Sequence, residues 1–336
     1  MRRLLSAPLL LLLTSLTLPL QAATVLKIAT IAPDGTNWMK QMRQAGEEIK
    51  QKTAGRVQLR FYPGGVMGND NSMLRKMRAG QLQGGAITGG GLSVIYGDAQ
   101  IYDLPFQFRN LAEVSAVRQQ MDQQIIDGLL DKGLVSFGLS EGGFAYLLSN
   151  KPVRSTEDMQ GLKIWIPEGD EVNAQMFKAL GISPIPLPLT DVMTGLQTGL
   201  IDTIASSPAG AISLQWHTQI KYLTEVPLAY LYATLVIQDK ALKPLTEGDR
   251  KILSETLQAT FAALNKQNRE DNVQALEALR QQGVEFVQPT LAQQKAWEQH
   301  ANEVLGRLSS QGIFSAGMLS QMQSLVQKQR SSSGTE

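Results

Sequence analysis

The side chains that most often carry enzyme chemistry are scarce in this chain. Its 336 residues include no cysteine and two histidines, His217 and His300, which lie far apart in the sequence. Without cysteine there is no thiolate nucleophile, disulfide or thiolate metal ligand, and two isolated histidines lack the spacing of a zinc site. The chain also has no G-x-S-x-G, H-E-x-x-H or Walker A motif. We therefore expect no catalytic residue, no metal and no cofactor.

Two other clusters have ordinary structural explanations. Residues 84–91, G-G-A-I-T-G-G-G, are followed by no Lys-Ser/Thr pair and lack the G-x-G-x-x-G spacing of a phosphate loop. They instead fit a place where backbone approaches a neighbour or a ligand. Residues 167–171, P-E-G-D-E, carry three carboxylates at a predicted helix start, where acidic residues interact with the helix dipole. A cation site is the alternative there.

Aromatic and small polar side chains remain as candidate ligand contacts. Trp165 lies in G-L-K-I-W-I-P, a predicted strand that ends at a proline. Phe144 and Tyr146 share one face of another strand and Ala145 lies on the other, but the pattern does not say which face meets a cleft. Ligands of α/β proteins bind near the carboxyl ends of strands. The remaining candidates are Trp38, Trp216, Ser206, Ser207, Asn69 and Asp70. Packing in the core is the alternative for each tryptophan.

The first 23 residues have the pattern of a secretory signal peptide. Arg2 and Arg3 precede the apolar run Leu9–Leu13, and the segment ends in small residues at Ala22 and Ala23, where we expect cleavage. A transmembrane anchor is the alternative, but prolines and hydroxyl residues keep the apolar run below the ~20 residues that a spanning helix needs. We therefore expect an exported protein of the bacterial periplasm.

The elements that must position the candidates alternate between strand and helix. Residues 24–32 predict a strand and Thr36 the cap of a helix, a pattern that favours an α/β fold with a mainly parallel sheet. Residues 134–150 and 231–242 predict long strands, and residues 215–223, around His217, an amphipathic helix. Two α/β halves joined by long strands imply two lobes that hinge about a central ligand cleft.

The predicted boundaries follow from this alternation. Residues 24–148 and about 232–275 form the first lobe, and residues 149–231 and about 276–330 form the second, with long C-terminal helices. The chain has 31 Lys and Arg against 30 Asp and Glu, so without Arg2 and Arg3 it is close to neutral. Because no basic patch with interleaved aromatic residues occurs, we expect no nucleic-acid partner.

Several segments, in order, resemble the DctP-type substrate-binding proteins of tripartite ATP-independent periplasmic (TRAP) transporters over nearly the whole chain. They are residues 27–38 (K-I-A-T-I-A-P-D-G-T-N-W), 101–110 (I-Y-D-L-P-F-Q-F-R-N), 161–167, and 179–202, where A-L-G-x-x-P-x-P precedes G-L-Q-x-G-x-x-D. The resemblance implies a two-lobed type II periplasmic binding protein. Such a receptor closes on one small-molecule ligand and presents it to the large and small TRAP membrane subunits, without catalysis.

The chain departs from the family pattern at three positions. Most members carry an arginine where this chain has Trp165, and that arginine forms a bidentate pair with a ligand carboxylate. Ala145 stands where many carry a basic residue, and the A-S-S-P of residues 205–208 where many carry an acid or amide. The resemblance therefore implies a ligand that is apolar, aromatic or less acidic than usual. Relatives without the arginine also imply a tetratricopeptide-repeat partner protein.

Three alternatives remain open at this stage. A carboxylate ligand held by a different arginine, such as Arg109 or Arg154, is the first. A periplasmic enzyme on the same scaffold, dependent on His217, is the second. A scaffold or chaperone subunit without a small ligand is the third. The sequence fixes neither the ligand nor the oligomeric state.

Overall fold

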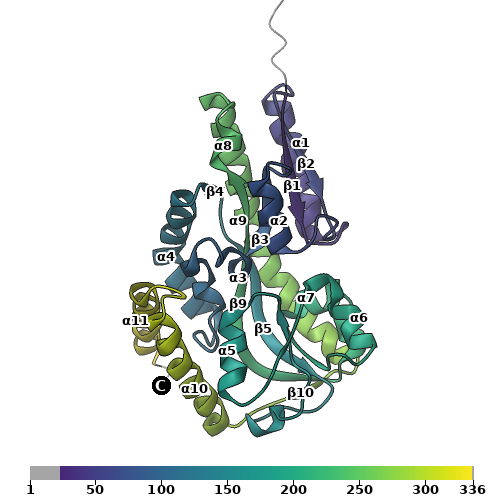
Figure 1. Ribbon diagram of the computed structural model, residues 1–336, viewed down its shortest axis with the longest axis vertical. Coiled ribbons are helices and arrows are strands. Elements are labelled where there is room, and N and C mark those ends of the chain that lie inside the picture. Colours follow the sequence, from purple (N-terminus) through teal and green to yellow (C-terminus); the bar gives the residue numbers. More distant parts are fainter. Residues whose placement is uncertain (1–22, 335–336) are drawn as a thin grey trace, which may run out of the picture.

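A long mixed β-sheet runs through both lobes of the computed structural model, which describes residues 23–334 (Figure 1). Its strands lie in the order β2-β1-β3-β9-β5-β8, and β4 and β10 also pair with β9. Two short strands, β6 and β7, form a second sheet. The strand bounds are β1 (Thr24–Thr30), β2 (Val57–Tyr62), β3 (Gly84–Thr88), β4 (Leu134–Ser136), β5 (Ser140–Ser149), β6 (Trp165–Pro167), β7 (Ile185–Leu187), β8 (Thr203–Ser206), β9 (Tyr222–Gln238) and β10 (Glu285–Val287).

The two-lobed α/β fold is confirmed, but the sheet is not mainly parallel. Strand β1 pairs in parallel with β2 and β3, as expected. Strand β9 runs antiparallel to β3, β4 and β5, because it returns the chain from one lobe to the other along strands that are already in place. The expectation of a mainly parallel sheet was therefore wrong at the centre of the molecule.

The long strands have different limits from those predicted. The strand expected over 134–150 divides at Gly138, whose φ of +143° interrupts the ladder between β4 and β5. Strand β9 begins at Tyr222, nine residues before the predicted start, and is 17 residues long. The helix expected around His217 is only a 3₁₀ turn, η4 (Trp216–Gln219). Tyr222, Thr224 and Val226 favour the extended chain that follows it.

Helices cover the sheets, and all the described α-helices except α6 and α8 begin at a side-chain cap. Thr36 accepts a hydrogen bond from the backbone N–H of Met39, as its predicted role as an N-cap requires. The α-helices are α1 (Asn37–Lys52), α2 (Asp70–Arg78), α3 (Gly89–Leu92), α4 (Leu111–Asp131), α5 (Glu171–Ala179), α6 (Val192–Gln197), α7 (Pro208–Ser213), α8 (Asp239–Leu242), α9 (Glu247–Gln281), α10 (Leu291–Ser310) and α11 (Ala316–Ser333). Other 3₁₀ turns are η1 (Gly97–Asp103), η2 (Glu157–Met159) and η3 (Leu189–Asp191).

Helix α9 runs along both lobes (Figure 1). It packs against α1 in one lobe, and against β5 and α7 further along its length. The C-terminal helices separate, since α10 packs on α5 whereas α11 packs on α4. The residue boundaries proposed for the two lobes stay a prediction.

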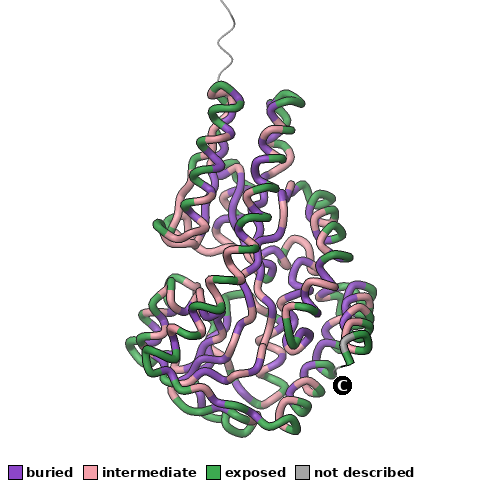
Figure 2. Tube along the Cα trace, turned by 180° about the vertical axis from the view of Figure 1, so that it is seen from behind, coloured by how far each residue is buried: buried purple, intermediate pink, exposed green. Residues whose placement is uncertain are grey.

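Buried residues run through both lobes (Figure 2) and form several hydrophobic cores. One contains Leu26, Met42 and Leu257, from β1, α1 and α9. Another contains Trp165 and Trp216, together with buried residues of β8, β9 and α9. A third and larger core packs buried residues of α2 and α4 against buried residues of α5, α10 and α11. The lobes are therefore joined by apolar packing as well as by the strands that cross.

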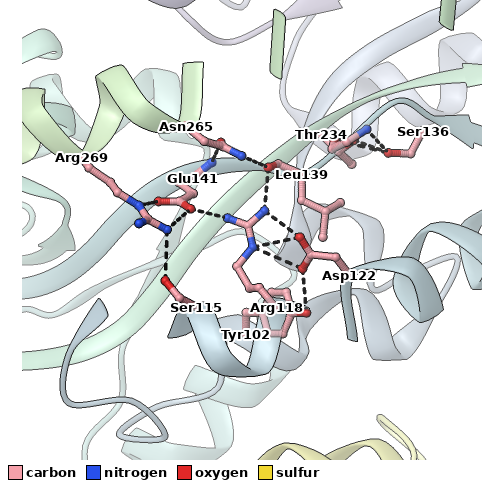
Figure 3. A network of polar contacts seen from close by, with 11 residues as sticks. Tyr102, Ser115, Arg118, Asp122, Ser136, Leu139, Glu141, Thr234, Asn265 and Arg269 are labelled. Carbon is pink, nitrogen blue, oxygen red and sulfur yellow. Dashed lines mark hydrogen bonds and ion pairs between the residues drawn. The ribbon is translucent and has the colours of Figure 1, made fainter. Parts of the chain in front are cut away.

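A buried ion-pair network fixes the start of β5 between α4 and α9 (Figure 3). Glu141 accepts hydrogen bonds from Arg118 at 2.8 Å and from Arg269 at 2.7 Å. Arg118 also pairs with Asp122 at 2.8 Å and donates to the carbonyl of Leu139. Burial would raise the pKa of Glu141, but the two arginines outweigh it and the pKa is lowered. This network holds the crossing strand to two helices.

Candidate ligand-binding site

A cavity of about 320 Å³ lies between the lobes. The starts of α2, α3 and the end of η1 line one side, and β6, the start of α5, the end of β8 and α7 line the other, with β5 and β9 between them. This volume is within the range of small-molecule sites. The wall is mostly apolar, with several carboxyl, amide and hydroxyl groups among its side chains.

Trp165 belongs both to the cavity wall and to the adjoining core. It is 5% exposed, and its ring meets that of Trp216 edge to face, with 5.5 Å between the ring centroids. Its indole Nε1 donates a hydrogen bond to the carbonyl oxygen of Leu187 at 3.0 Å. Since that donor already has an acceptor, Trp165 offers the cavity apolar ring surface. Trp216, predicted more as core than as contact, lines the same wall.

The predicted serines also line the cavity, at the end of β8. Ser206 Oγ donates to the carbonyl of Ser207 at 3.1 Å. Ser207 is the N-cap of α7, where its hydroxyl accepts from the backbone N–H of Gly210. Both hydroxyl groups therefore have structural roles besides any contact with a ligand.

Asn69 and Asp70 lie where the two sides of the cavity meet. Asn69 caps α2 and donates from Nδ2 to Glu168 Oε2, at 2.7 Å, on the loop that leads into α5. Asp70 Oδ2 accepts from the hydroxyl of Thr88 at 2.6 Å and from its backbone N–H at 3.2 Å. Loss of water around Asp70 raises its pKa to about 6, although the bonds from Thr88 oppose the change.

Three aromatic residues that were predicted to contact a ligand, Phe144, Tyr146 and Trp38, lie outside the wall of this cavity, which corrects the expectation for their positions. Phe144 packs edge to face on Tyr230, at 5.3 Å between centroids, and Tyr146 packs on the core that contains Trp165. The opposite face of β5 lines the cavity with Ala145 and Leu147, because side chains alternate along a strand.

Trp38 is the third of these residues. It packs against the core formed by β1, α1 and α9 and does not line the cavity. Its place near the start of α1 explains this, since the apolar stripe of a helix packs against the sheet beneath it.

Asp103 is a site residue that the sequence analysis did not single out, and Asp170 was considered there only as part of the acidic cluster at a helix start. Burial, and the nearby charge of Asp170, raise the pKa of the Asp103 carboxyl well above its ordinary value, against hydrogen bonds from backbone N–H groups. Asp170 caps α5 and accepts from Asn173; burial raises its pKa too. A lone aspartate inside the apolar segment I-Y-D-L-P was the available signal.

Basic residues are absent from the part of the cavity wall that the structure describes. Arg109 forms an ion pair with Glu298 at 2.9 Å, and neither Arg109 nor Arg154 lines the cavity. His217 and His300 each lie within 3.3 Å of a backbone carbonyl, on different elements. Within residues 23–334 no group of three His, Cys, Asp or Glu side chains is placed to hold a metal ion.

A second cavity, of about 40 Å³, adjoins the first. The two share Leu147, Asn173, Phe177 and Leu228, and the smaller one extends toward Phe106 and Trp297. Its wall is almost wholly apolar. The two cavities together therefore form one space, with an apolar extension at the end of the smaller cavity and carboxylates in the wall of the larger one.

Comparisons with known proteins agree on one type of molecule. Residues 28–311 match the model of the bacterial extracellular solute-binding protein, family 7 (DctP). The C4-dicarboxylate-binding periplasmic protein DctP of Rhodobacter capsulatus is 26% identical over 259 residues, covering 75% of this chain and 77% of that protein.

Two solved structures have the same fold. A sugar-acid-binding protein from Advenella mimigardefordensis, in complex with galactonate, has a TM-score of 0.84 at 18% identity and covers 92% of this chain and 99% of its own. A TRAP periplasmic solute-binding protein from Shewanella oneidensis, with bound succinate, has a TM-score of 0.83 at 22% identity and covers 91% and 100%. No helix within residues 23–334 is both long and apolar enough to cross a bilayer.

Proposed function

Because the chain belongs to the DctP family of solute-binding proteins of TRAP transporters, we propose that it captures a small organic ligand that is less acidic than those of its relatives and delivers it to a TRAP permease. The family consists of solute-binding proteins rather than enzymes, which removes the enzyme alternative. The ligand occupies the cavity of about 320 Å³.

The observation that carries this proposal is the absence of a positive side chain from the described cavity wall. A carboxylate buried without a partner loses several kcal/mol of hydration free energy. Trp165 stands at the position where the family arginine is expected, and its indole N–H is already bonded to Leu187. An aromatic or aliphatic part of the ligand would instead pack on Trp165, Trp216 and the adjoining apolar cavity.

The second candidate is a receptor for an organic acid. It is favoured by the relatives, because the proteins named above bind C4-dicarboxylate, galactonate or succinate. For this chain it would require that Arg109 or Arg154 reach the ligand. Arg109 would first have to leave Glu298, so we rank this candidate below the first.

Native mass spectrometry of the mature chain purified from periplasm, followed by identification of the released compound, tests the proposal. We expect the released compound to have no free carboxylate. A Trp165→Phe variant should bind less of it than the wild type, whereas Trp38→Phe, which changes a tryptophan outside the cavity, should bind the same amount. A bound dicarboxylate or sugar acid would favour the second candidate.

The other parts of the proposal concern location and partners. Residues 1–22 of the predicted signal peptide lie outside the described residues, and we propose cleavage near Ala22 or Ala23 from the sequence pattern alone. N-terminal sequencing of the exported protein tests it. The TRAP membrane subunits are the proposed partners. A tetratricopeptide-repeat partner rests only on the missing arginine, and affinity capture from the native host with the transporter subunits as reference tests it.

A further inference from the structure

We propose that the ligand carries a protonated nitrogen, which the carboxylates of Asp70 and Asp103 bind. This inference rests on the proposed receptor function and specifies its ligand class: an amine, amidine or guanidine attached to an apolar body. Both aspartates line the cavity, on the side opposite Trp165.

Each of these two carboxylates has an unused acceptor. Asp70 uses Oδ2 for both bonds from Thr88, while its Oδ1 is buried and has no hydrogen-bond partner among the described residues. Asp103 Oδ1 is also buried without a partner there. Buried polar atoms are nearly always paired in native proteins, so two orphan carboxylate oxygens in the wall of one cavity point to a donor that the ligand supplies.

The glycine run of residues 89–91 is built around the same two side chains. A Cβ atom at Gly91 would collide with Asp70 Oδ2, and one at Gly89 would lie 2.7 Å from Asp103 Oδ2. Glycine at both positions therefore lets the two carboxylates approach α3 from its two sides. This accounts for Gly91 and, together with the close approach of Tyr232 and the Ala99 carbonyl, for Gly89.

The charges on the wall reinforce the argument. The ionisable acids of the larger cavity are Asp70, Asp103, Glu168 and Asp170, and no base lines its described wall, whereas His300 lines the smaller cavity. Glu168 and Asp170 already accept hydrogen bonds from Asn69 and Asn173. A cation between Asp70 and Asp103 would offset carboxylate charge, whereas an anionic ligand would add to the repulsion.

The apolar wall defines the rest of the ligand. Trp165 and Trp216 present ring surface to the cavity, and the smaller cavity adds Phe106, Met176 and Trp297. An aromatic or branched aliphatic amine satisfies both the carboxylates and this surface. A small, strongly hydrated polyamine would pair with the carboxylates but would not cover the apolar surface.

The test begins with a thermal-shift screen of the ligand-free mature chain. The panel contains amines, carboxylates and uncharged metabolites of similar size, and titration calorimetry gives the Kd of each compound that binds. The same titrations are made on Asp70→Asn and Asp103→Asn, which keep the side-chain shape. Asp127→Asn, at an exposed position on α4 outside the cavity, is the control.

We expect an amine to bind and its Kd to rise about tenfold or more in Asp70→Asn or Asp103→Asn, but not in Asp127→Asn. Binding by carboxylates or uncharged compounds alone, or amine binding that neither variant weakens, overturns this inference and leaves the receptor function standing. If no compound of any class binds, the proposed receptor function fails and this inference with it. Two variants are used so that poor folding of one does not decide the result.

Discussion

Replacing Asp70 by asparagine should stabilise the ligand-free protein at neutral pH. The carboxyl of Asp70 has a folded-state pKa of about 6, raised from 3.8 by the loss of water around it. A raised carboxyl pKa means that the folded state binds the proton more tightly than the unfolded state. Stability is therefore greatest below pH 4 and falls as the pH rises to about 6, above which the loss is complete.

The size of the effect follows from the shift. About 2 pKa units, at ~1.36 kcal/mol each, correspond to about 3 kcal/mol at pH 7 and to less than about 1 kcal/mol at pH 4. Asparagine can keep both bonds from Thr88 to one oxygen, but its amide N–H₂ replaces an oxygen that has no partner. An unpaired amide costs about 1–2 kcal/mol, so the net gain at pH 7 should be about 1–2 kcal/mol.

Urea unfolding of wild type, Asp70→Asn and Asp127→Asn, followed by tryptophan fluorescence at several pH values, measures this difference. In a thermal scan, the melting temperature at pH 7 should rise by about 1.5–3 °C, given ~2.1 cal/mol/K of unfolding entropy per residue. The exposed control should change little. If Asp70→Asn lowers stability at pH 7, or if its effect is the same at pH 4, the reasoning that places a costly carboxylate at this position is wrong.

Three further substitutions test other parts of the structure. Glu141→Gln should destabilise the fold by about 1.5–3 kcal/mol in chemical unfolding, because two charged hydrogen bonds are weakened while Arg118 keeps only Asp122 as an acidic partner; a change below ~1 kcal/mol would contradict the network's role. Ala145→Phe should fill the cavity and remove ligand binding in calorimetry while the circular dichroism spectrum stays native; unchanged affinity would place the ligand elsewhere. Glu168→Ala removes the bond from Asn69 that joins the two sides of the cavity, which should shift the equilibrium between closed and open forms by no more than ~1 kcal/mol toward the open form. The radius of gyration measured by X-ray scattering should therefore increase. An unchanged radius would show that this bond does not hold the lobes together.

Local signals in the sequence predicted most of the elements, because caps and turns depend on neighbouring residues. Thr36 caps α1 as expected, and α2 ends at Arg78, two residues before Gly80, whose φ of +75° suits glycine. Strand limits that depend on pairing with distant parts of the chain were predicted wrongly. Residues 222–230 extend because they pair with β5 and β10, and nothing in their own periodicity fixes that partner.

The candidate site was predicted in part for the same reason. Trp165, Ser206 and Asp70 were found because they sit at strand ends or at positions that the family resemblance marks. Strand alternation paired Phe144 with Tyr146 correctly but could not say which face of β5 looks inward, since that depends on helices packed much later in the chain. Asp103 was missed because its importance comes from the apolar surroundings that folding creates.

The position of β9 in the sequence has a consequence for the order in which the molecule can be completed. Strands β3, β4 and β5 all wait for a partner that is not synthesised until residues 222–238. Until β9 has been made, the edges of β3, β4 and β5 that pair with it stay unpaired, and the sheet is incomplete in both lobes. About two thirds of the chain is therefore made before β9 can complete the sheet of either lobe, so the stable fold can form only late in synthesis.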